Sequence, residues 1–201
     1  MDEVPKRKQR ADVVRNRAKL LGVAQKHFVA HGVATSLEAV AKEAGVGPGT
    51  LYRHFPTRDS LLAGLLEVGR RELVEQQGRI DSIIDVEVAL REWLLAIEDY
   101  FSLYSGLPQP LVSTLAEGDA DSALKRSCSD LIAITGRYLD NAQRDGFVRM
   151  DVQAIDLFMT ASMLAWLRTT GAVDPAALNR LRSTWEAGCR KQSERGVESA
   201  E

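Results

Sequence analysis

The apolar residues of this chain recur at intervals of three and four along most of its length. This spacing places them on one face of an α-helix, whereas a half-buried strand would alternate apolar and polar residues. The sequence contains no such alternating stretch. The helical spacing covers residues 11–31, 58–77, 86–104, 121–145, 152–170 and 175–189. With two shorter helices near the N-terminus, the pattern predicts an all-α protein of about nine helices.

The two shorter helices are separated by a glycine turn. Thr35 and Glu38 have the spacing of a capping box, so we expect the first helix to start at Thr35. Gly45 follows the last apolar residue and supplies the left-handed conformation that ends many helices. Pro48 suits the first position of the second helix, where its missing N–H costs nothing. The segment up to Phe55 therefore has the pattern of a helix-turn-helix with a recognition helix.

The second short helix has an apolar side and a polar side. Leu51 and Phe55 lie four residues apart and should face the protein. The side chains left outside are hydrogen-bond donors that suit phosphates and base edges: Thr50, Tyr52, Arg53 and His54. The spacing by itself also fits an ordinary helical hairpin in a soluble protein.

The segment AKEAGVGPGTLYRHFPTRDSLL, residues 41–62, resembles the DNA-binding signature of the TetR family of transcriptional regulators. The resemblance implies a helix-turn-helix domain of three helices over residues 1–56 and a larger helical domain for ligand binding and dimerisation over residues 57–201. It also implies roles for single residues, with Thr35 part of the DNA-binding set. Phosphate contacts fall to Tyr52, His54 and Arg58, and base or groove contacts fall to Pro48, Gly49, Thr50 and Arg53.

Two positions depart from the family pattern. Many relatives carry Ser-Lys where this chain has Gly47-Pro48, so a capping hydroxyl and a cation are missing. A basic residue is frequent at the position of Glu38, which we expect only to cap its helix. The operator sequence therefore does not follow from the resemblance.

The charge distribution agrees with a DNA-binding N-terminal third. The formal net charge of the chain is -2, which does not suit a general nucleic-acid binder. However, residues 1–60 hold 11 Lys and Arg against 6 Asp and Glu, while residues 61–201 hold 15 against 22. This division concentrates phosphate attraction at one end of the molecule. Residues 1–10 are basic and nearly free of apolar side chains, so we expect a disordered arm that either touches DNA or only aids solubility.

In the TetR family the larger domain holds a small-molecule pocket, and ligand binding sets the separation of the two DNA-binding domains. The aromatic residues of this domain would suit a hydrophobic or aromatic ligand, although residues at the same spacing also make an ordinary core. The candidates for the pocket are Trp93, Ile97, Tyr100, Phe101, Tyr104, Leu107, Leu111, Leu131, Tyr138, Met159, Met163 and Trp166.

One recognition helix contacts only a few base pairs, so helix-turn-helix proteins bind DNA as two-fold dimers. In the TetR family the last two helices pack against those of a second subunit as a four-helix bundle. The candidate anchors of this interface are Phe158, Met163, Trp166, Leu181 and Trp185, although some of them must complete the core of the monomer.

Other classes of function find little support in the sequence. The three histidines lie in or beside the helix-turn-helix, and no catalytic triad is suggested, so we predict no enzyme and no cofactor. His27 and His31 are four residues apart but lack an evident third ligand, so no metal site is predicted. Cys128 and Cys189 stand alone, each a small buried residue or an oxidation sensor.

No segment has the length and apolarity of a membrane span, and the N-terminus is charged where a signal peptide would be apolar. We therefore expect a cytoplasmic protein. The working hypothesis is a homodimeric repressor that a small, mostly hydrophobic ligand releases from a palindromic double-stranded operator. The alternative is a helical regulator or scaffold that does not respond to a small molecule.

Overall fold

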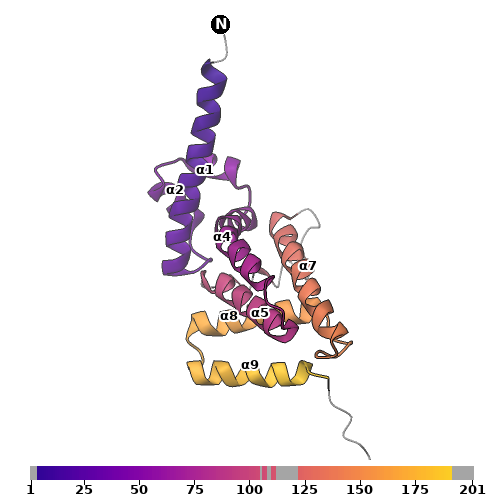
Figure 1. Ribbon diagram of the computed structural model, residues 1–201. Coiled ribbons are helices and arrows are strands. Elements are labelled where there is room, and N and C mark those ends of the chain that lie inside the picture. The colour runs from indigo at the N-terminus through magenta and orange to yellow at the C-terminus, as the bar shows by residue number, and fades with distance from the viewer. Residues whose placement is uncertain (1–3, 105, 108–109, 112–121, 192–201) are drawn as a thin grey trace, which may run out of the picture.

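The computed structural model describes residues 4–104, 106–107, 110–111 and 122–191, and of residues 4–11 it describes the backbone alone. These residues form eight helices (Figure 1): α1 (Val4–His31), α2 (Leu37–Glu43), α3 (Pro48–His54), α4 (Arg58–Ile80), α5 (Val86–Ser102), α7 (Ala123–Arg144), α8 (Ala154–Thr170) and α9 (Pro175–Cys189). The prediction of an all-α fold is confirmed. The sequence also allows one or two short turns over residues 111–117, but this segment lies almost wholly outside the described residues. No helix in the described part of the chain could cross a bilayer.

Helix α1 begins earlier than the pattern predicted. We expected a disordered arm over residues 1–10, but the backbone from Val4 onwards is helical and continuous with the rest of α1. The sequence of this segment contains lysines, arginines and a glutamine, which are residue types with high helix propensity. Because elongating an existing helix is far easier than nucleating one, such a segment can extend α1 without a core of its own. Figure 1 shows this end of α1 projecting beyond the rest of the molecule.

Helices α1, α2 and α3 form a small domain, called here the reading head, at one end of the molecule (Figure 1). The stripe that we expected on α1 is only partly buried, because Val14 and Ala18 are exposed. The buried side chains of the head come from all three helices and the turns between them: Leu20, Ala24, Phe28, Val33, Leu37, Val40, Ala41, Ala44, Leu51 and Phe55.

Ser36, and not Thr35, caps helix α2. The Ser36 hydroxyl accepts a hydrogen bond from the backbone N–H of Ala39 at 3.3 Å and donates one to the carboxylate of Glu38 at 2.8 Å. The predicted capping box of Thr35 with Glu38 is therefore wrong by one residue. Both neighbours carry a hydroxyl, so local sequence does not separate them. The turn after Gly32, whose φ is 75°, determines which hydroxyl reaches the helix.

Helices α5, α7 and α8 pack together in the larger domain, and α4 runs into this domain from the reading head (Figure 1). Aromatic rings fill the interior. The ring of Trp93 stacks on that of Tyr138, with centroids 5.4 Å apart, and Phe101 meets Phe158 edge-on at the same distance. Helix α9 lies along α8, on the side away from the reading head (Figure 1).

A buried carboxylate ties α9 to the larger domain. Glu98 of α5 is 2% exposed, and its two oxygens accept hydrogen bonds from Arg182 of α9 at 2.8 and 2.9 Å. Arg168 of α8 approaches the same carboxylate at 3.5 Å. A buried charge requires partners of opposite sign, so these three residues hold α5, α8 and α9 in one arrangement.

Candidate DNA-binding surface

Helix α3 begins at Pro48 and has the buried side that the sequence predicted, but it ends at His54, one residue before the predicted end. Gly47 precedes it in an extended conformation, and Pro48 is its first residue. Leu51 is fully buried and Phe55, just after the helix, is 1% exposed, so these two side chains anchor α3 in the reading head. Gly45, at φ +64°, makes the turn that separates α3 from α2.

The rest of α3 faces outward. The Tyr52 side chain is 42% exposed. Two side chains, those of Thr50 and His54, are half-buried, and the remaining positions are exposed: Pro48, Gly49, Tyr52 and Arg53. The structure thus brings these six predicted DNA-binding residues together on one short helix.

A hydrogen bond joins Tyr52 to α2. The Tyr52 hydroxyl donates to the carboxylate of Glu38 at 2.9 Å, and the same carboxylate accepts from Ser36. The hydrogen bond from Ser36, with smaller contributions from the backbone of Glu38 and from Tyr52, holds the pKa of Glu38 below its usual range. The bond to Glu38 raises the pKa of Tyr52. Tyr52 can therefore donate to a phosphate only if its hydroxyl leaves Glu38.

Arg58 makes contacts inside the protein that the resemblance did not indicate. Its Nη1 donates hydrogen bonds to the backbone carbonyls of Val33 and of Thr35, the latter at 2.8 Å. These carbonyls lie in the turn between α1 and α2, where no helix supplies them with a donor. Arg58 thus holds this turn in place through Nη1, and the DNA contacts of Arg58 and Thr35 stay predictions.

Gly47 and Gly49, on either side of Pro48, have no side chains that would cover the backbone at the start of α3. A Cβ placed on Gly47 or on Gly49 would have nothing within 4 Å. The packing of the head therefore does not require glycine at either position. Because the two side chains are absent, a second molecule can reach the backbone of α3 from outside.

Helix α4 contacts both domains through glycines. A Cβ on Gly64 would lie 3.0 Å from side-chain atoms of both Leu21 and Phe55, which belong to the reading head. A Cβ on Gly69 would lie 3.1 Å from the ring of Tyr100 on α5. Helix α4 is continuous from Arg58 to Ile80, so one helix carries both of these contacts.

Two family models match this chain. Residues 20–65 match the one described as bacterial regulatory proteins, tetR family. Residues 85–190, more than half of the chain, match the C-terminal domain of SbtR-like transcriptional regulators. The chain belongs to the TetR family of transcriptional regulators.

Individual relatives of this TetR-family chain differ in how much of it they cover. An HTH-type transcriptional regulator of Staphylococcus aureus is 43% identical over 53 residues, which are 26% of this chain and only 29% of that protein. The regulator UidR of Escherichia coli is 22% identical over 150 residues, 74% of this chain and 75% of its own length. A TetR transcriptional regulator from Streptomyces coelicolor has a crystal structure that matches with a TM-score of 0.52 and 29% identity, covering 88% of this chain and 99% of the other.

Most of the residues predicted to line a ligand pocket are buried. Trp93 Nε1 donates to the Thr135 hydroxyl at 2.9 Å, and the Tyr100 hydroxyl donates to the carbonyl of Leu66 at 2.5 Å, so these polar atoms are satisfied inside the protein. Met159 is half-buried, whereas the buried members of the set are Trp93, Ile97, Tyr100, Phe101, Tyr104, Leu107, Leu111, Leu131 and Tyr138. These positions suit a core, and their contact with a ligand stays a prediction.

Of the predicted dimer anchors, three are exposed, Trp185 is half-buried and Phe158 is buried. Met163 and Trp166 on α8 and Leu181 on α9 are 54%, 42% and 44% exposed, and these three side chains are called here the open apolar face. For Met163 and Trp166 this exposure does not suit the interior pocket for which they were also candidates. Phe158 is fully buried against Phe101, so it belongs to the core of the monomer.

The histidines and cysteines that the sequence singled out have the following surroundings. His27 Nε2 lies 2.7 Å from the carboxylate of Glu43, which joins α1 to α2. Among the described residues, no group of three potential metal ligands occurs. Cys128 is buried, which raises the pKa of its thiol to about 12. Cys189 is half-buried, and burial is also the main cause that raises its pKa.

The sequence did not indicate that Glu38 contacts Tyr52, nor that Glu98 holds α9. The two members of the first pair are 14 residues apart and those of the second 84, so no local pattern connects them. The only signal available was that Glu98 stands among apolar residues of a predicted buried stripe.

Proposed function

We propose that this regulator is a homodimeric repressor that binds a palindromic operator through α3 of each subunit and releases it when a small, mostly hydrophobic ligand binds. The outward face of α3 carries this proposal. Its Tyr52 and Arg53 are exposed, with Tyr52 bonded to the exposed carboxylate of Glu38, whereas Leu51 and Phe55 are buried and anchor the helix.

The proposed contacts differ in chemistry. Arg53 can donate two parallel hydrogen bonds to O6 and N7 of a guanine, which would specify a base. Thr50, Tyr52 and His54 can donate to phosphate oxygens, which would set the position of the head on the duplex. The bare backbone at Gly49 would let the DNA approach closely.

The open apolar face of α8 and α9 supports the dimer. Met163, Trp166 and Leu181 lie on two adjacent helices and are exposed in the isolated chain. Exposed apolar patches of this kind commonly mark protein interfaces. A second copy related by a two-fold axis would cover the face and would present two copies of α3 to half-sites one DNA turn or more apart.

The contacts of α4 support a response to a ligand. A ligand changes DNA affinity only if it binds one separation of the two heads better than another. Gly64 and Gly69 place α4 tightly against the head and against Tyr100, so a shift of α5 would be passed to α3. Such a response is typical of the TetR family.

Selection from a randomised duplex pool at two salt concentrations would test the proposal. We expect a two-fold symmetric site whose affinity falls steeply with salt, because phosphate contacts release counterions. Arg53→Ala should relax the preference at one position of each half-site and cost about 1–3 kcal/mol of binding free energy.

Arg71→Ala serves as the matched control, since Arg71 is an exposed arginine on α4 outside the recognition helix. The control should keep the affinity and the base preference of the unmodified protein. No enrichment at either salt concentration, or equal effects of the two substitutions, would contradict sequence recognition by α3.

A further inference from the structure

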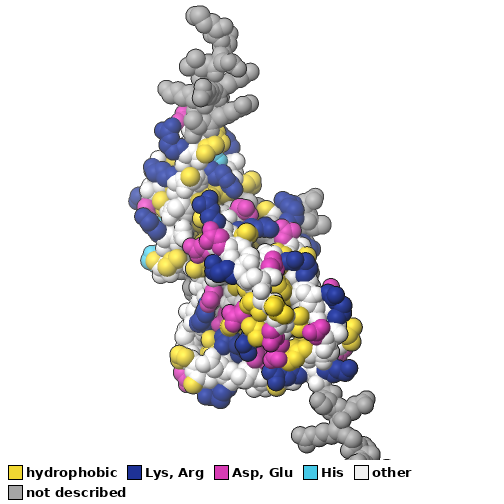
Figure 2. Space-filling view, in the orientation of Figure 1, with side chains coloured by type: hydrophobic (Ala, Val, Ile, Leu, Met, Phe, Trp, Pro, Cys, Tyr) yellow, Lys and Arg dark blue, Asp and Glu magenta, His cyan; other side chains and the backbone are white. Residues whose placement is uncertain are grey.

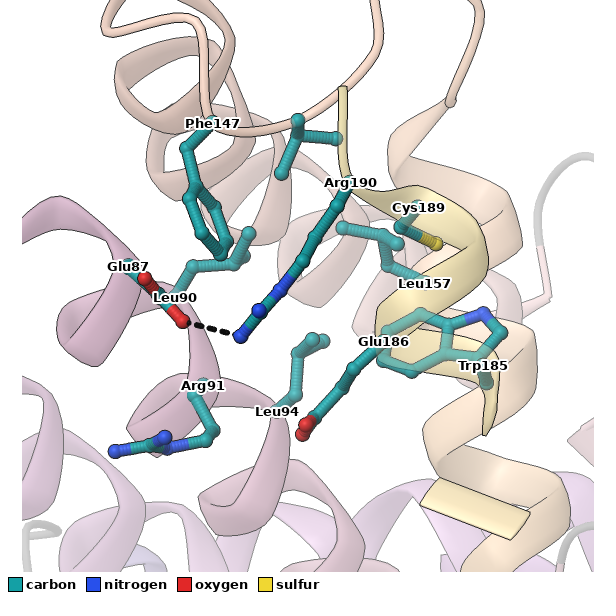
Figure 3. Close-up of a pocket in the computed structure, with 11 residues that line it drawn as sticks. Glu87, Leu90, Arg91, Leu94, Phe147, Leu157, Trp185, Glu186, Cys189 and Arg190 are labelled. Carbon is teal, nitrogen blue, oxygen red and sulfur yellow. Dashed lines mark hydrogen bonds and ion pairs between the residues drawn. The ribbon is translucent and has the colours of Figure 1, made fainter. Parts of the chain in front are cut away.

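The carboxylate of Glu38 lies on the surface of the reading head without a cation bonded to it. An acid of the larger domain shows the more usual arrangement, since Glu87 accepts a hydrogen bond from Arg190 at 2.8 Å (Figure 3). Both bonds of the Glu38 carboxylate come instead from hydroxyls, those of Ser36 at 2.8 Å and Tyr52 at 2.9 Å. In the part of the chain that the structure describes, Glu38 forms no ion pair.

The guanidinium of Arg58 does not take the place of such a partner. Its Nη1 is already bonded to two backbone carbonyls, those of Val33 and Thr35. The hydrogen bond from Ser36 is the largest cause that lowers the pKa of Glu38, and the charge of Arg58 is the smallest. Glu38 therefore presents an exposed negative charge at neutral pH.

This charge stands where the head would meet the DNA backbone. In the view of Figure 2, Lys and Arg side chains predominate over Asp and Glu on the reading head, as expected of a surface that meets phosphates. The Tyr52 hydroxyl has one proton, so it can donate either to Glu38 or to a phosphate. A phosphate oxygen that accepts this proton would lie about 2.8 Å from the hydroxyl and thus about 5 Å from the Glu38 carboxylate. At that separation the two anions repel each other.

Glu38 therefore weakens the binding of any duplex that offers it no hydrogen-bond donor. Its carboxylate has lone pairs left after the bonds from Ser36 and Tyr52, because two carboxylate oxygens can accept about four hydrogen bonds. In the major groove, guanine and thymine present only acceptor atoms. Adenine presents an amino group beside the acceptor N7, which repels a carboxylate, whereas cytosine presents its N4 amino group alone. Cytosine is the base that suits Glu38.

We propose that Glu38 is a specificity-determining residue that selects a cytosine in each operator half-site by accepting a hydrogen bond from its N4 amino group. This inference rests on the proposed operator binding through α3. At a site with another base, the carboxylate loses water without gaining a donor, and this loss reduces affinity. Arg53 on α3 suits a guanine, so α2 and α3 contribute separate base contacts.

Selection from a randomised duplex pool with the full chain tests this assignment. The unmodified protein should enrich a two-fold site with a C·G pair at one position of each half-site that responds to Glu38. Glu38→Gln keeps an oxygen for Ser36 and Tyr52 but can pair with N6 and N7 of adenine, so the preference at that position should move to an A·T pair. Glu38→Ala should weaken the preference there about tenfold, the loss expected for one hydrogen bond to a charged group.

Binding titrations with a fixed duplex that lacks the operator measure the repulsion separately. Glu38→Gln should bind this duplex about threefold tighter than the unmodified chain at low salt. The gain should shrink at higher salt, because the repulsion is screened. A residue that only caps α2 or orients Tyr52 would produce neither this gain nor the change of base preference, since Gln can accept the same two hydrogen bonds.

Glu43→Gln is the matched control, because it makes the same change of charge at the other end of α2, where Glu43 lies 2.7 Å from His27. It should keep the base preference of the unmodified chain, and thermal melting checks that each variant folds. If the unmodified chain enriches no sequence, the proposed operator binding and this inference are both wrong. If an operator is enriched, three outcomes overturn the inference alone: the same base preference in both Glu38 variants, an equal change in Glu43→Gln, or an A·T pair preferred by the unmodified chain at the responding position.

Discussion

Two tyrosines show how differently the reading head and the larger domain use the same residue type. Tyr52 on α3 is 42% exposed, and its hydroxyl bonds to the exposed carboxylate of Glu38. Tyr100 on α5 is 7% exposed, and its hydroxyl bonds to the buried carbonyl of Leu66. The first hydroxyl can exchange its partner for an outside group at little cost, whereas the second would leave a buried carbonyl unpaired.

The difference teaches that polar atoms in the two domains serve different purposes. On α3 the polar atoms lie where a second molecule can reach them, while in the larger domain they complete the core. Substitutions on α3 should therefore change binding more than stability, and substitutions around Tyr100 should do the reverse. The following predictions test this contrast, beginning with the largest effect.

Phe101→Ala should lower the free energy of unfolding by about 3–5 kcal/mol, because it removes a fully buried ring and leaves a cavity. Arg53→Ala on the exposed face of α3 should change it by less than about 0.5 kcal/mol. Denaturant titration of both variants measures these values. Similar losses of unfolding free energy in the two variants would show that the outward face of α3 stabilises the fold. This result would contradict the contrast between α3 and the core of the larger domain.

Gly64→Ala should cost about 1–3 kcal/mol of stability, because the added methyl group would lie 3.0 Å from Leu21 and Phe55. Gly78→Ala is the matched control in the same helix, since nothing lies within 4 Å of its added Cβ, and it should stabilise by up to about 1 kcal/mol. Thermal unfolding distinguishes the two. If both substitutions stabilise the protein, α4 does not press on the head at Gly64.

Removing each tyrosine hydroxyl sharpens the contrast further. Tyr100→Phe should lower the free energy of unfolding by about 1 kcal/mol, since it deletes a buried hydrogen bond. Tyr52→Phe should have a smaller effect on unfolding but should weaken operator binding, if its hydroxyl moves from Glu38 to a phosphate. Unfolding curves measure the change in stability of both variants, and binding titrations measure the change in their operator affinity. A Tyr52→Phe protein that binds the operator normally would remove Tyr52 from the contact set.

The smallest effect concerns the pKa of Glu38. A carboxyl group whose pKa is lowered by folding contributes stability above its unfolded pKa, and this contribution is lost as the pH falls through the folded pKa. The link between α2 and α3 should therefore weaken only under acidic conditions. In an NMR titration, Ser36→Ala should raise the pKa of Glu38 more than Tyr52→Phe does, because the bond from Ser36 is the larger cause. The reverse order would show that the link to Tyr52 dominates.

Much of the fold could be predicted because its signals are local. The spacing of apolar residues gives the helices of the larger domain, and Gly45 followed by Pro48 marks the turn and the start of α3. Leu51 and Phe55 determine which side of α3 is buried, so the composition of the outward face follows as well. Each of these inferences needs only residues a few positions apart.

Other features depended on residues that are distant in the sequence. Whether Thr35 or Ser36 caps α2 depends on the path of the preceding turn, and Arg58 bonds to that turn across 23 and 25 residues. Phe158 was expected at a subunit interface but packs on Phe101 inside the monomer. A helical period shows which residues share a face, but it does not show what that face meets.

The sequence by itself therefore determined the helices, the turn and the polar surface of the recognition helix, since these depend on backbone preferences and on spacing along one helix. Only the tertiary structure decided which aromatic side chains are core and which apolar side chains stay exposed. The physical reason is that packing and charge pairing depend on distances in space, and those arise only when helices far apart in the chain come together.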